Sequence, residues 1–344
     1  MEAERPDSRR WQVSRVTIAL VGVCAGLVLS ASPSPALHRY EASRMSMACL
    51  YAIEAYGSDA AAQPHVLEEA FDEVDRIDRL MSHYKPDSPL SQLNREARRG
   101  PTPVDRELFD FIAESLRYSR ESQGAFDITV GPLMKAWGFF RGDGRVPSEP
   151  ELDAARRAVG ARHVVLDTAS RTIAFDDPNV ELDLGGIAKG YAVDRVVAVL
   201  KSRRVAAALV SAGGSSVYGL GAPPDRAGWT VSIQDPVDAR KTAFDVQLRD
   251  RALSVAGSSE KFFELDGRIY SHIMDPRSGR PVGDVLSVVV LSADATSGDA
   301  LDDAFFVLGP EGSSNYLQRL HGIDAYFFLP GPNRQVVRKR GGER

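Results

Sequence analysis

Residues 186–221 read GIAKGYAVDRVVAVLKSRRVAAALVSAGGSSVYGLG and combine two kinds of secondary-structure signal in one stretch. Residues 186–203 place apolar side chains three and four positions apart, which predicts a helix. Residues 206–221 form a short apolar run with a glycine-rich exit, which predicts a buried strand. A helix that runs directly into such a strand indicates a fold in which helices pack on sheets.

The flanking sequence continues this mixture in both directions. Helical spacing predicts further helices over 64–82, 105–122 and 151–160, one starting near Asp299, and one over 311–322. Strands are predicted over 45–57, 163–167, 172–176, 229–236, 251–257, 261–267, 286–293 and 325–330, and the basic tail 334–344 is expected to be frayed. Frequent hairpins, with no repeat or long linker, favour a mixed α+β fold with mostly antiparallel sheets packed with helices in a single domain.

The first 36 residues differ in kind from the rest. RRWQVSR (9–15) is basic, and VTIALVGVCAGLVLSA (16–31) is apolar but too short for a comfortable membrane span. Small residues, including Ser34 and Ala36, follow it. This pattern predicts a signal peptide over 1–36 and a mature domain over 37–344, exported to the periplasm or the outer face of the inner membrane. An uncleaved anchor, which would keep the protein near the membrane, is the alternative.

The overall composition excludes some classes of function. The 344 residues carry a net charge of −5, which gives no reason to expect a nucleic-acid partner. The six histidines are scattered, with no His-x-x-x-His or Cys-x-x-Cys pattern, so a structural zinc site is not expected. Once the signal is removed, Cys49 is the only cysteine, and no internal disulfide can form.

Three carboxylates crowd against an apolar run in residues 297–309, SGDALDDAFFVLG. Asp299, Asp302 and Asp303 stand at i, i+3 and i+4, so they share one face of a helix. Negative charge in a first helical turn offsets the helix dipole and needs no metal. The same oxygen ligands also suit a hard cation such as Mg²⁺. From these residues alone, both interpretations stay open.

Three other segments contain candidate binding residues. ELDLGGIAKGYAVD (181–194) places Asp183, two glycines and Lys189 at a helix start that suits phosphate, although a plain strand-to-helix turn would also explain it. GAFDITVGPLMKAWGF (124–139) offers aromatic surface and a carboxylate for a flat ring, or a core loop with a capping aspartate. YSHIMDPRSGRPV (270–282) holds His272, a candidate general base or a locally bonded histidine.

Six segments, taken in order, resemble the ApbE-type FAD:protein FMN transferases, formerly called thiamine biosynthesis lipoproteins. They are MSHYKPDSPLSQLN, GAFDITVGPLMKAWGF, LDLGGIAKGYAVDR, VSAGGS, YSHIMDPRSGRPV and TSGDALDDAFFVLG, and the resemblance covers about residues 45–330. It implies a T-fold-like single catalytic domain with a core of about 45–335. It also implies Mg²⁺-dependent transfer of FMN from FAD to a Ser or Thr hydroxyl of an acceptor flavoprotein, through a phosphoester bond with release of AMP. The implied acceptor motif, Ser/Thr-Gly-Ala-Ser/Thr, is absent from this chain, so self-modification is not expected.

The resemblance assigns roles residue by residue. It implies that Asp299 and Asp303 bind the metal, with Asp302 beside them and the Gly186 carbonyl as a third protein ligand. The implied FAD contacts are Met45, Tyr84, Ala125, Phe126, Asp127, Asp183, Lys189 and His272. His272 is the candidate that deprotonates the acceptor hydroxyl, and Asp183 is its rival.

Three departures from the family pattern keep two other activities open. Asp303 stands where Thr is usual, Ser215 where an acid is expected, and Val255 and Ala256 where a Thr-Ser pair is expected. A more negative metal site would change metal affinity or preference. The replacement of polar groups at the other two positions would change FAD affinity and the rate of FMN transfer. A flavin-binding carrier without transferase activity, or an FAD pyrophosphatase that yields FMN and AMP, are the alternatives.

Overall fold

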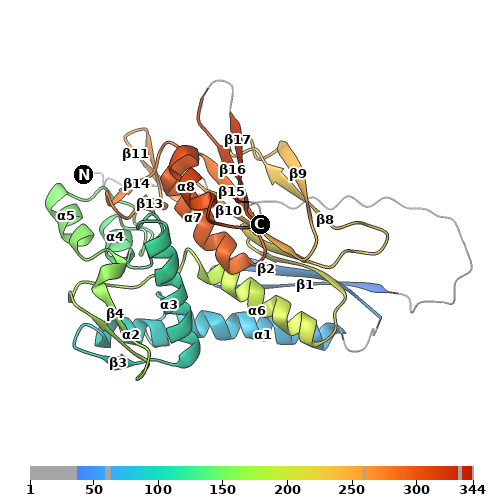
Figure 1. Cartoon of the computed structure of the whole chain (residues 1–344), viewed down its shortest axis with the longest axis horizontal. Helices are drawn as coiled ribbons and strands as arrows, with labels where there is room; N and C mark the ends of the chain where they lie inside the picture. The colour runs from blue at the N-terminus through green and yellow to red at the C-terminus, as the bar shows by residue number, and fades with distance from the viewer. Residues whose placement is uncertain (1–36, 59–62, 259–260, 332–334, 343–344) are drawn as a thin grey trace, which may run out of the picture.

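An eight-stranded sheet forms the centre of the molecule, in the order β1-β2-β6-β7-β10-β15-β16-β17 (Figure 1). All neighbouring strands in it pair antiparallel. The structure is a computed structural model that describes residues 37–58, 63–258, 261–331 and 335–342. The α+β class predicted from sequence, with mostly antiparallel sheets, is therefore confirmed.

The sheet strands are β1 (His38–Ser46), β2 (Cys49–Gly57), β6 (Ala207–Ala212), β7 (Ser216–Leu220), β10 (Arg251–Gly257), β15 (Ser287–Ser292), β16 (Asp324–Phe328) and β17 (Val336–Arg340). The helices are α1 (Gln63–Met81), α2 (Pro89–Glu96), α3 (Arg106–Glu121), α4 (Gly131–Ala136), α5 (Glu149–Arg157), η1 (Ala161–His163), α6 (Ala188–Ser202), α7 (Ala295–Gly312) and α8 (Ser314–Leu317). The remaining strands are β3 (Thr102–Pro103), β4 (Val164–Asp167), β5 (Thr172–Phe175), β8 (Trp229–Gln234), β9 (Thr242–Leu248), β11 (Phe262–Leu265), β12 (Arg268–Ser271), β13 (Met274–Asp275) and β14 (Arg280–Pro281).

The central strands are buried on both faces. Along β15, Val288 and Val290 join the core under α6 and α7, whereas Val289 and Leu291 join a second core under the β8–β9 hairpin. Successive side chains of a strand point to opposite faces, so one strand supplies both cores. Strands buried in this way form nearly continuous apolar runs, as residues 286–293 do.

Three long helices cover one face of the sheet and position the site. Figure 1 shows α1, α6 and α7 together beside the sheet, and α6 contacts both α1 and α7. Figure 1 also shows α2–α5 and the short strands gathered at one end of the sheet. On α1, apolar residues spaced at helical intervals are buried, among them Phe71, Val74 and Ile77.

Five sequence predictions need correction. A tight turn at Met47 and Ala48, both with positive φ, splits the single strand predicted over 45–57. Likewise, residues 206–221 form the β6–β7 hairpin rather than one strand. The tail predicted to fray forms edge strand β17, where Arg338 and Arg340 pair with Asp324. The helix predicted near Asp299 begins at Ala295, and the one predicted over 311–322 is reduced to α8 after a break at Gly309.

The N-terminal predictions concern residues that the structure does not describe. The predicted signal peptide, 1–36, lies outside the described residues. None of the described helices combines the length and apolar character needed to cross a membrane.

Candidate active site

A cavity of about 500 Å³ lies where the predicted segments converge. Its volume is in the range typical of small-molecule sites. The predicted site residues that line it are Tyr84, Ala125, Phe126, Asp127, Asp183, Gly186, Lys189, His272, Asp299, Asp302 and Asp303. Met45 is the predicted contact that does not line the cavity: it lies on β1 with 67% of its surface exposed, and Met47 lines the cavity instead.

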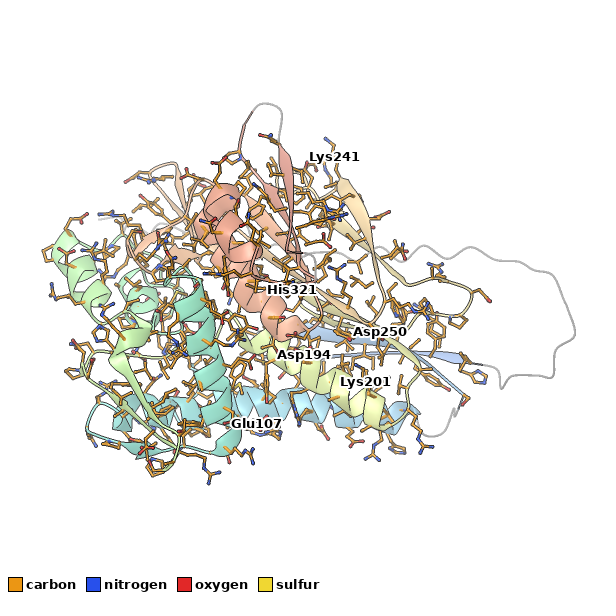
Figure 2. The ribbon with its side chains drawn as sticks, in the orientation of Figure 1. Glu107, Asp194, Lys201, Lys241, Asp250 and His321 are labelled. Carbon is orange, nitrogen blue, oxygen red and sulfur yellow. The ribbon has the colours of Figure 1, made fainter. Side chains whose placement is uncertain are left out.

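The carboxylates of α7 are not needed to begin their helix. Asp294 caps α7 by accepting a hydrogen bond from the Ser297 N–H, and Asp194 of α6 accepts from the N–H groups of Ala295 and Thr296 (Asp194 is labelled in Figure 2). Asp299 and Asp302 therefore lie beyond the first turn, yet they are only 4% and 5% exposed. An offset of the helix dipole does not account for their burial.

Asp299 joins three parts of the fold at the acidic end of the cavity. Its Oδ2 accepts a hydrogen bond from the Gly190 N–H of α6 at 2.6 Å, and its Oδ1 accepts from the hydroxyls of Ser216 at 2.5 Å and Ser254 at 3.1 Å. Burial raises the pKa of Asp299, while the positive charge of Lys189 and these hydrogen bonds oppose the rise. The acidic end therefore buries carboxyl groups whose charged form a cation would stabilise.

The donors at this end are oxygen atoms, which fit Mg²⁺. Within the described part of the chain, no three His, Cys, Asp or Glu side chains converge as a metal site by themselves. Asp303 approaches the backbone of Gly186 so closely that a Cβ on Gly186 would overlap Asp303 Oδ2. Mg²⁺ is usually held by one or two carboxylates together with waters and substrate phosphates, so a set of Asp303, Asp299 and the Gly186 carbonyl fits it.

Lys189 lies in the opening turn of α6, beside the two glycines that precede the helix. Its Nζ donates a hydrogen bond of 2.5 Å to the Ser215 hydroxyl. Ser215 stands where the family pattern has an acid, so the partner of Lys189 at that position is a neutral hydroxyl. An ammonium group near a helix N-terminus suits an anionic phosphate.

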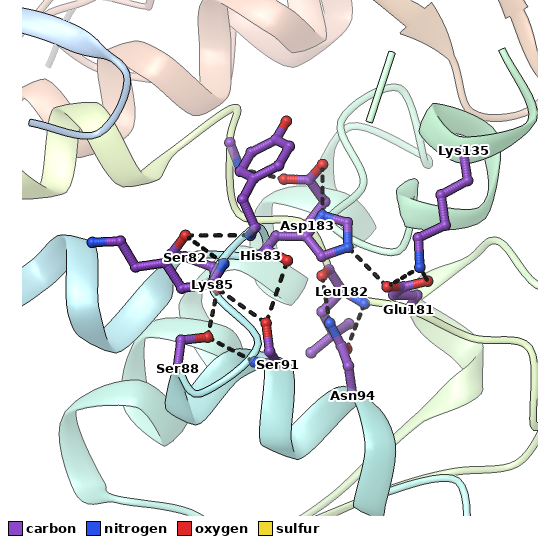
Figure 3. A network of polar contacts seen from close by, with 12 residues as sticks. Ser82, His83, Lys85, Ser88, Ser91, Asn94, Lys135, Glu181, Leu182 and Asp183 are labelled. Atoms are coloured by element: carbon purple, nitrogen blue, oxygen red, sulfur yellow. Dashed lines mark hydrogen bonds and ion pairs between the residues drawn. The ribbon is translucent and has the colours of Figure 1, made fainter. Parts of the chain in front are cut away.

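A histidine that the sequence analysis did not single out organises the neighbouring wall (Figure 3). His83 is 6% exposed, its Nε2 contacts Glu181 Oε1 at 2.8 Å, and its Nδ1 lies 3.3 Å from Asp183 Oδ2. Lys135 completes the network with an ion pair of 2.6 Å to Glu181. Burial alone would lower the pKa of His83, but the two carboxylates raise it to about 9. Burial would likewise raise the pKa of Asp183, yet His83 and the Gly185 N–H lower it.

His272 faces the same cavity with its tautomer defined. Its Nδ1 contacts the Lys261 carbonyl oxygen at 3.0 Å, and a carbonyl can only accept, so Nδ1 carries the proton. Nε2 is then the nitrogen that can accept one. Burial, with the charges of Lys261 and Lys189, lowers the pKa of His272 to about 3.

Both carboxylate oxygens of Asp127 accept hydrogen bonds from other groups of the protein. Oδ1 accepts from the Thr129 N–H at 2.8 Å and the Thr129 hydroxyl at 2.6 Å, and Oδ2 accepts from the Ala161 N–H at 3.0 Å. Any contact of this residue with a ligand has to share these atoms. Nearby, Tyr84 stacks on Phe140 with ring centroids 5.2 Å apart, and 53% of its surface is exposed.

The sequence offered only a weak signal for the His83 network. Glu181 and Asp183 stand two positions apart, a spacing that would put their side chains on one side of an extended chain. That pattern indicates a common partner, but His83 lies 98 residues from Glu181 in sequence and no local spacing identifies it. Lys261 also lines the cavity, and no sequence motif identified it.

A mixed α+β domain that gathers carboxylates, a lysine and a histidine around one cavity has the groups that an enzyme uses for acid–base chemistry and for binding an anionic ligand. The chain belongs to the ApbE family, whose model matches residues 47–327. It is 33% identical over 280 residues to an FAD:protein FMN transferase of Escherichia coli K12, covering 78% of each chain. It is 32% identical over 338 residues to a protein of the same name from Treponema pallidum, covering 93% of this chain and 91% of that one. Among solved structures, the flavin transferase ApbE from Vibrio cholerae matches with a TM-score of 0.78 and 28% identity, over 89% of this chain and 98% of that one.

Proposed function

We propose that this protein is an FAD:protein FMN transferase that moves FMN from FAD to a Ser or Thr hydroxyl of an acceptor flavoprotein. The hydroxyl oxygen bonds to the phosphorus of the FMN half, the anhydride bond breaks, and AMP leaves with the electron pair. The hydroxyl proton passes to a base on the enzyme. The names of the curated relatives and the convergence of Lys189, Asp299 and His272 on one cavity support this proposal.

Each end of the cavity has a separate task. Gly185 and Gly186 let the backbone approach the diphosphate, and Lys189 offsets its charge at the start of α6. Asp299 and Asp303, with the Gly186 carbonyl, would hold Mg²⁺, which supplies charge stabilisation for the phosphoryl oxygens when it is bound. Tyr84 and Phe126 offer ring surface for the flavin or the adenine.

His272 is the preferred base because its Nε2 is the unprotonated nitrogen. The lowered pKa of His272 keeps the ring neutral at pH 7. The same lowered pKa makes His272 a weaker base. Asp183 is the rival, since His83 keeps it ionised at the same cavity. A phosphoester at the acceptor is the product in either case.

The family departures bear on two competing activities. Ser215, Val255 and Ala256 all line the cavity. The polar groups that the family pattern has at these positions are therefore replaced at the site itself. An enzyme that positions water better than the acceptor hydroxyl would be an FAD pyrophosphatase, and one that does neither would be a flavin carrier.

The acceptor and the location follow from the same proposal. The acceptor carries a Ser/Thr-Gly-Ala-Ser/Thr motif, and the reaction occurs outside the cytoplasm, in the periplasm or at the outer face of the inner membrane. The basic and apolar pattern of residues 1–36 supports export.

Incubation of the purified protein with FAD, Mg²⁺ and an acceptor carrying that motif tests the proposal. We expect a fluorescent acceptor band that survives denaturation, one AMP released per label, and no label on an acceptor whose Ser or Thr is replaced by Ala. AMP without a labelled acceptor would indicate a pyrophosphatase. Bound FAD with neither product would indicate a carrier.

A further inference from the structure

A second cavity, of about 570 Å³, lies beside the active cavity and is rich in arginine. Asp127 and Pro276 line both cavities, so the two are neighbours. We call the second one the arginine cleft. Its arginines come from the end of α3, the end of α5, η1 and the β13–β14 turn, and they are Arg120, Arg156, Arg157, Arg162 and Arg277.

Local structure explains only part of this cluster. Arg156 pairs with Asp153 at 3.2 Å, and Arg277 pairs with Asp275 at 2.8 Å. A cation in the last turn of a helix offsets the dipole, which gives Arg120 and Arg157 a role at their own helix ends. That role does not require them to share a cleft with Arg162. Among the described residues, no carboxylate forms an ion pair with Arg120, Arg157 or Arg162, although the whole chain carries a net charge of −5.

The wall between the two cavities is firmly built. The Asp127 carboxylate binds the Ala161 N–H and Thr129, and the Thr129 hydroxyl accepts from the Gly160 N–H at 2.7 Å. Gly160 has a φ of 132°, and a Cβ there would overlap a guanidinium nitrogen of Arg162. The glycine therefore lets Arg162 fold across the wall, where its charge also lowers the pKa of Asp127 against the effect of burial.

We propose that the arginine cleft binds a carboxylate-rich segment of the acceptor protein and so docks the acceptor with its hydroxyl at the active cavity. Guanidinium groups form paired hydrogen bonds with carboxylates, and several exposed arginines suit an extended acidic segment better than one small anion. This inference rests on the proposed function, which requires a protein to present a hydroxyl at the adjoining cavity.

Two variants with the same change in net charge test the proposal. The cleft variant is Arg120→Glu, Arg156→Glu and Arg157→Glu. The control variant is Arg79→Glu, Arg95→Glu and Arg99→Glu, at exposed arginines of α1, α2 and the turn after it. Neither set lines the active cavity.

The first measurement does not depend on catalysis. A fluorescent hexaglutamate peptide is titrated with each protein at low ionic strength, and binding is followed by anisotropy. We expect the wild-type and control proteins to bind the peptide alike and the cleft variant to bind at least about tenfold more weakly. Equal binding by all three proteins, or equal weakening in both variants, would overturn the proposal. The proposal would also be overturned if the cleft variant bound anionic lipid vesicles more weakly than the wild type but bound the peptide equally well.

The second measurement compares FMN transfer to two synthetic acceptors, one with and one without a hexaglutamate extension of the Ser-Gly-Ala-Thr motif. The extension should lower KM in the wild-type and control proteins and have no effect in the cleft variant, with transfer to the short peptide unchanged. An equal KM for both acceptors in the wild type would overturn docking. If the wild type transfers FMN to neither acceptor, the proposed function fails, and binding of the two peptides then decides the docking proposal alone.

Discussion

Nδ1 of His83 lies 3.3 Å from a carboxylate oxygen of Asp183, inside the wall of the active cavity. The other ring nitrogen contacts Glu181 at 2.8 Å, so the imidazole bridges two carboxylates that stand two positions apart in the sequence. A buried ring in this position is held as a cation, with its pKa raised to about 9 by the two carboxylates despite burial. His83 thereby fixes both the ionisation and the position of Asp183.

This bridge predicts a pH-dependent stability. The folded protein keeps a proton on His83 that the unfolded chain loses near pH 6.5. The stabilisation is complete below pH 6.5 and disappears as the pH rises through about 9, with an upper bound of about 3 kcal/mol. Urea unfolding at pH 6 and pH 9.5 should show this fall in the wild type.

His83→Gln should lower stability at pH 6 and flatten the difference between the two pH values. His65→Gln, at an exposed position of α1, is the control and should retain the wild-type difference. An unchanged pH dependence in His83→Gln would show that the bridge does not hold the proton.

The replacement His272→Gln should slow FMN transfer by roughly 10²–10⁴ while FAD still binds, because a general base contributes about that factor. Since burial and two lysines lower the pKa of His272 to about 3, the wild-type kcat/KM should not fall between pH 8 and pH 5 through titration of this ring. The measurement is the pH profile of kcat/KM. An acid limb centred near pH 6.5 would argue against a neutral His272 in the free enzyme.

Asp299→Asn should reduce Mg²⁺-dependent transfer by more than about tenfold, because even groups that merely orient metal ligands have effects of 10 to 100-fold. The amide would also turn a donor toward Gly190, Ser216 or Ser254, so thermal unfolding is measured in parallel. Asp294→Asn, on the same helix, keeps a good N-cap and is the matched control. Equal Mg²⁺ dependence in all three proteins would remove Asp299 from the metal site.

Gly190→Ala should destabilise the protein by about 1–3 kcal/mol, the usual effect of overpacking a filled core. A Cβ at this position would overlap the Ala295 carbonyl and lie 3.0 Å from Asp299, and so it would force α6 away from α7. Gly312→Ala, at an exposed site near the end of α7, should be neutral or slightly stabilising. Thermal unfolding of both variants checks the contrast, and equal melting temperatures would show that the close approach of α6 and α7 tolerates a methyl group.

Local sequence predicted those features that depend on local spacing. The helix predicted over 64–82 is α1, Gln63–Met81, because its apolar residues recur at helical intervals. The turn at Met47 and Ala48 was missed because both residues adopt positive φ without a Gly or Asn signal. Strand β17 was missed because its pairing depends on β16, which supplies Asp324 for its arginines.

The candidate site was predictable mainly through the family resemblance. The resemblance placed Asp183, Lys189, His272 and Asp299 together, although they are far apart in sequence. It did not identify His83, whose role depends on two carboxylates that only the folded chain brings to it. The same limit applies to the arginine cleft, since its arginines come from four separate segments.

A crystal structure with FAD and Mn²⁺ tests most directly whether the acidic end of the cavity holds a cation against the flavin diphosphate. We expect an anomalous peak in contact with Asp303, the Gly186 carbonyl and a diphosphate oxygen, close to Asp299, with Lys189 on the same phosphates. A diphosphate bound at the Tyr84 end, with no metal near α7, would contradict this arrangement.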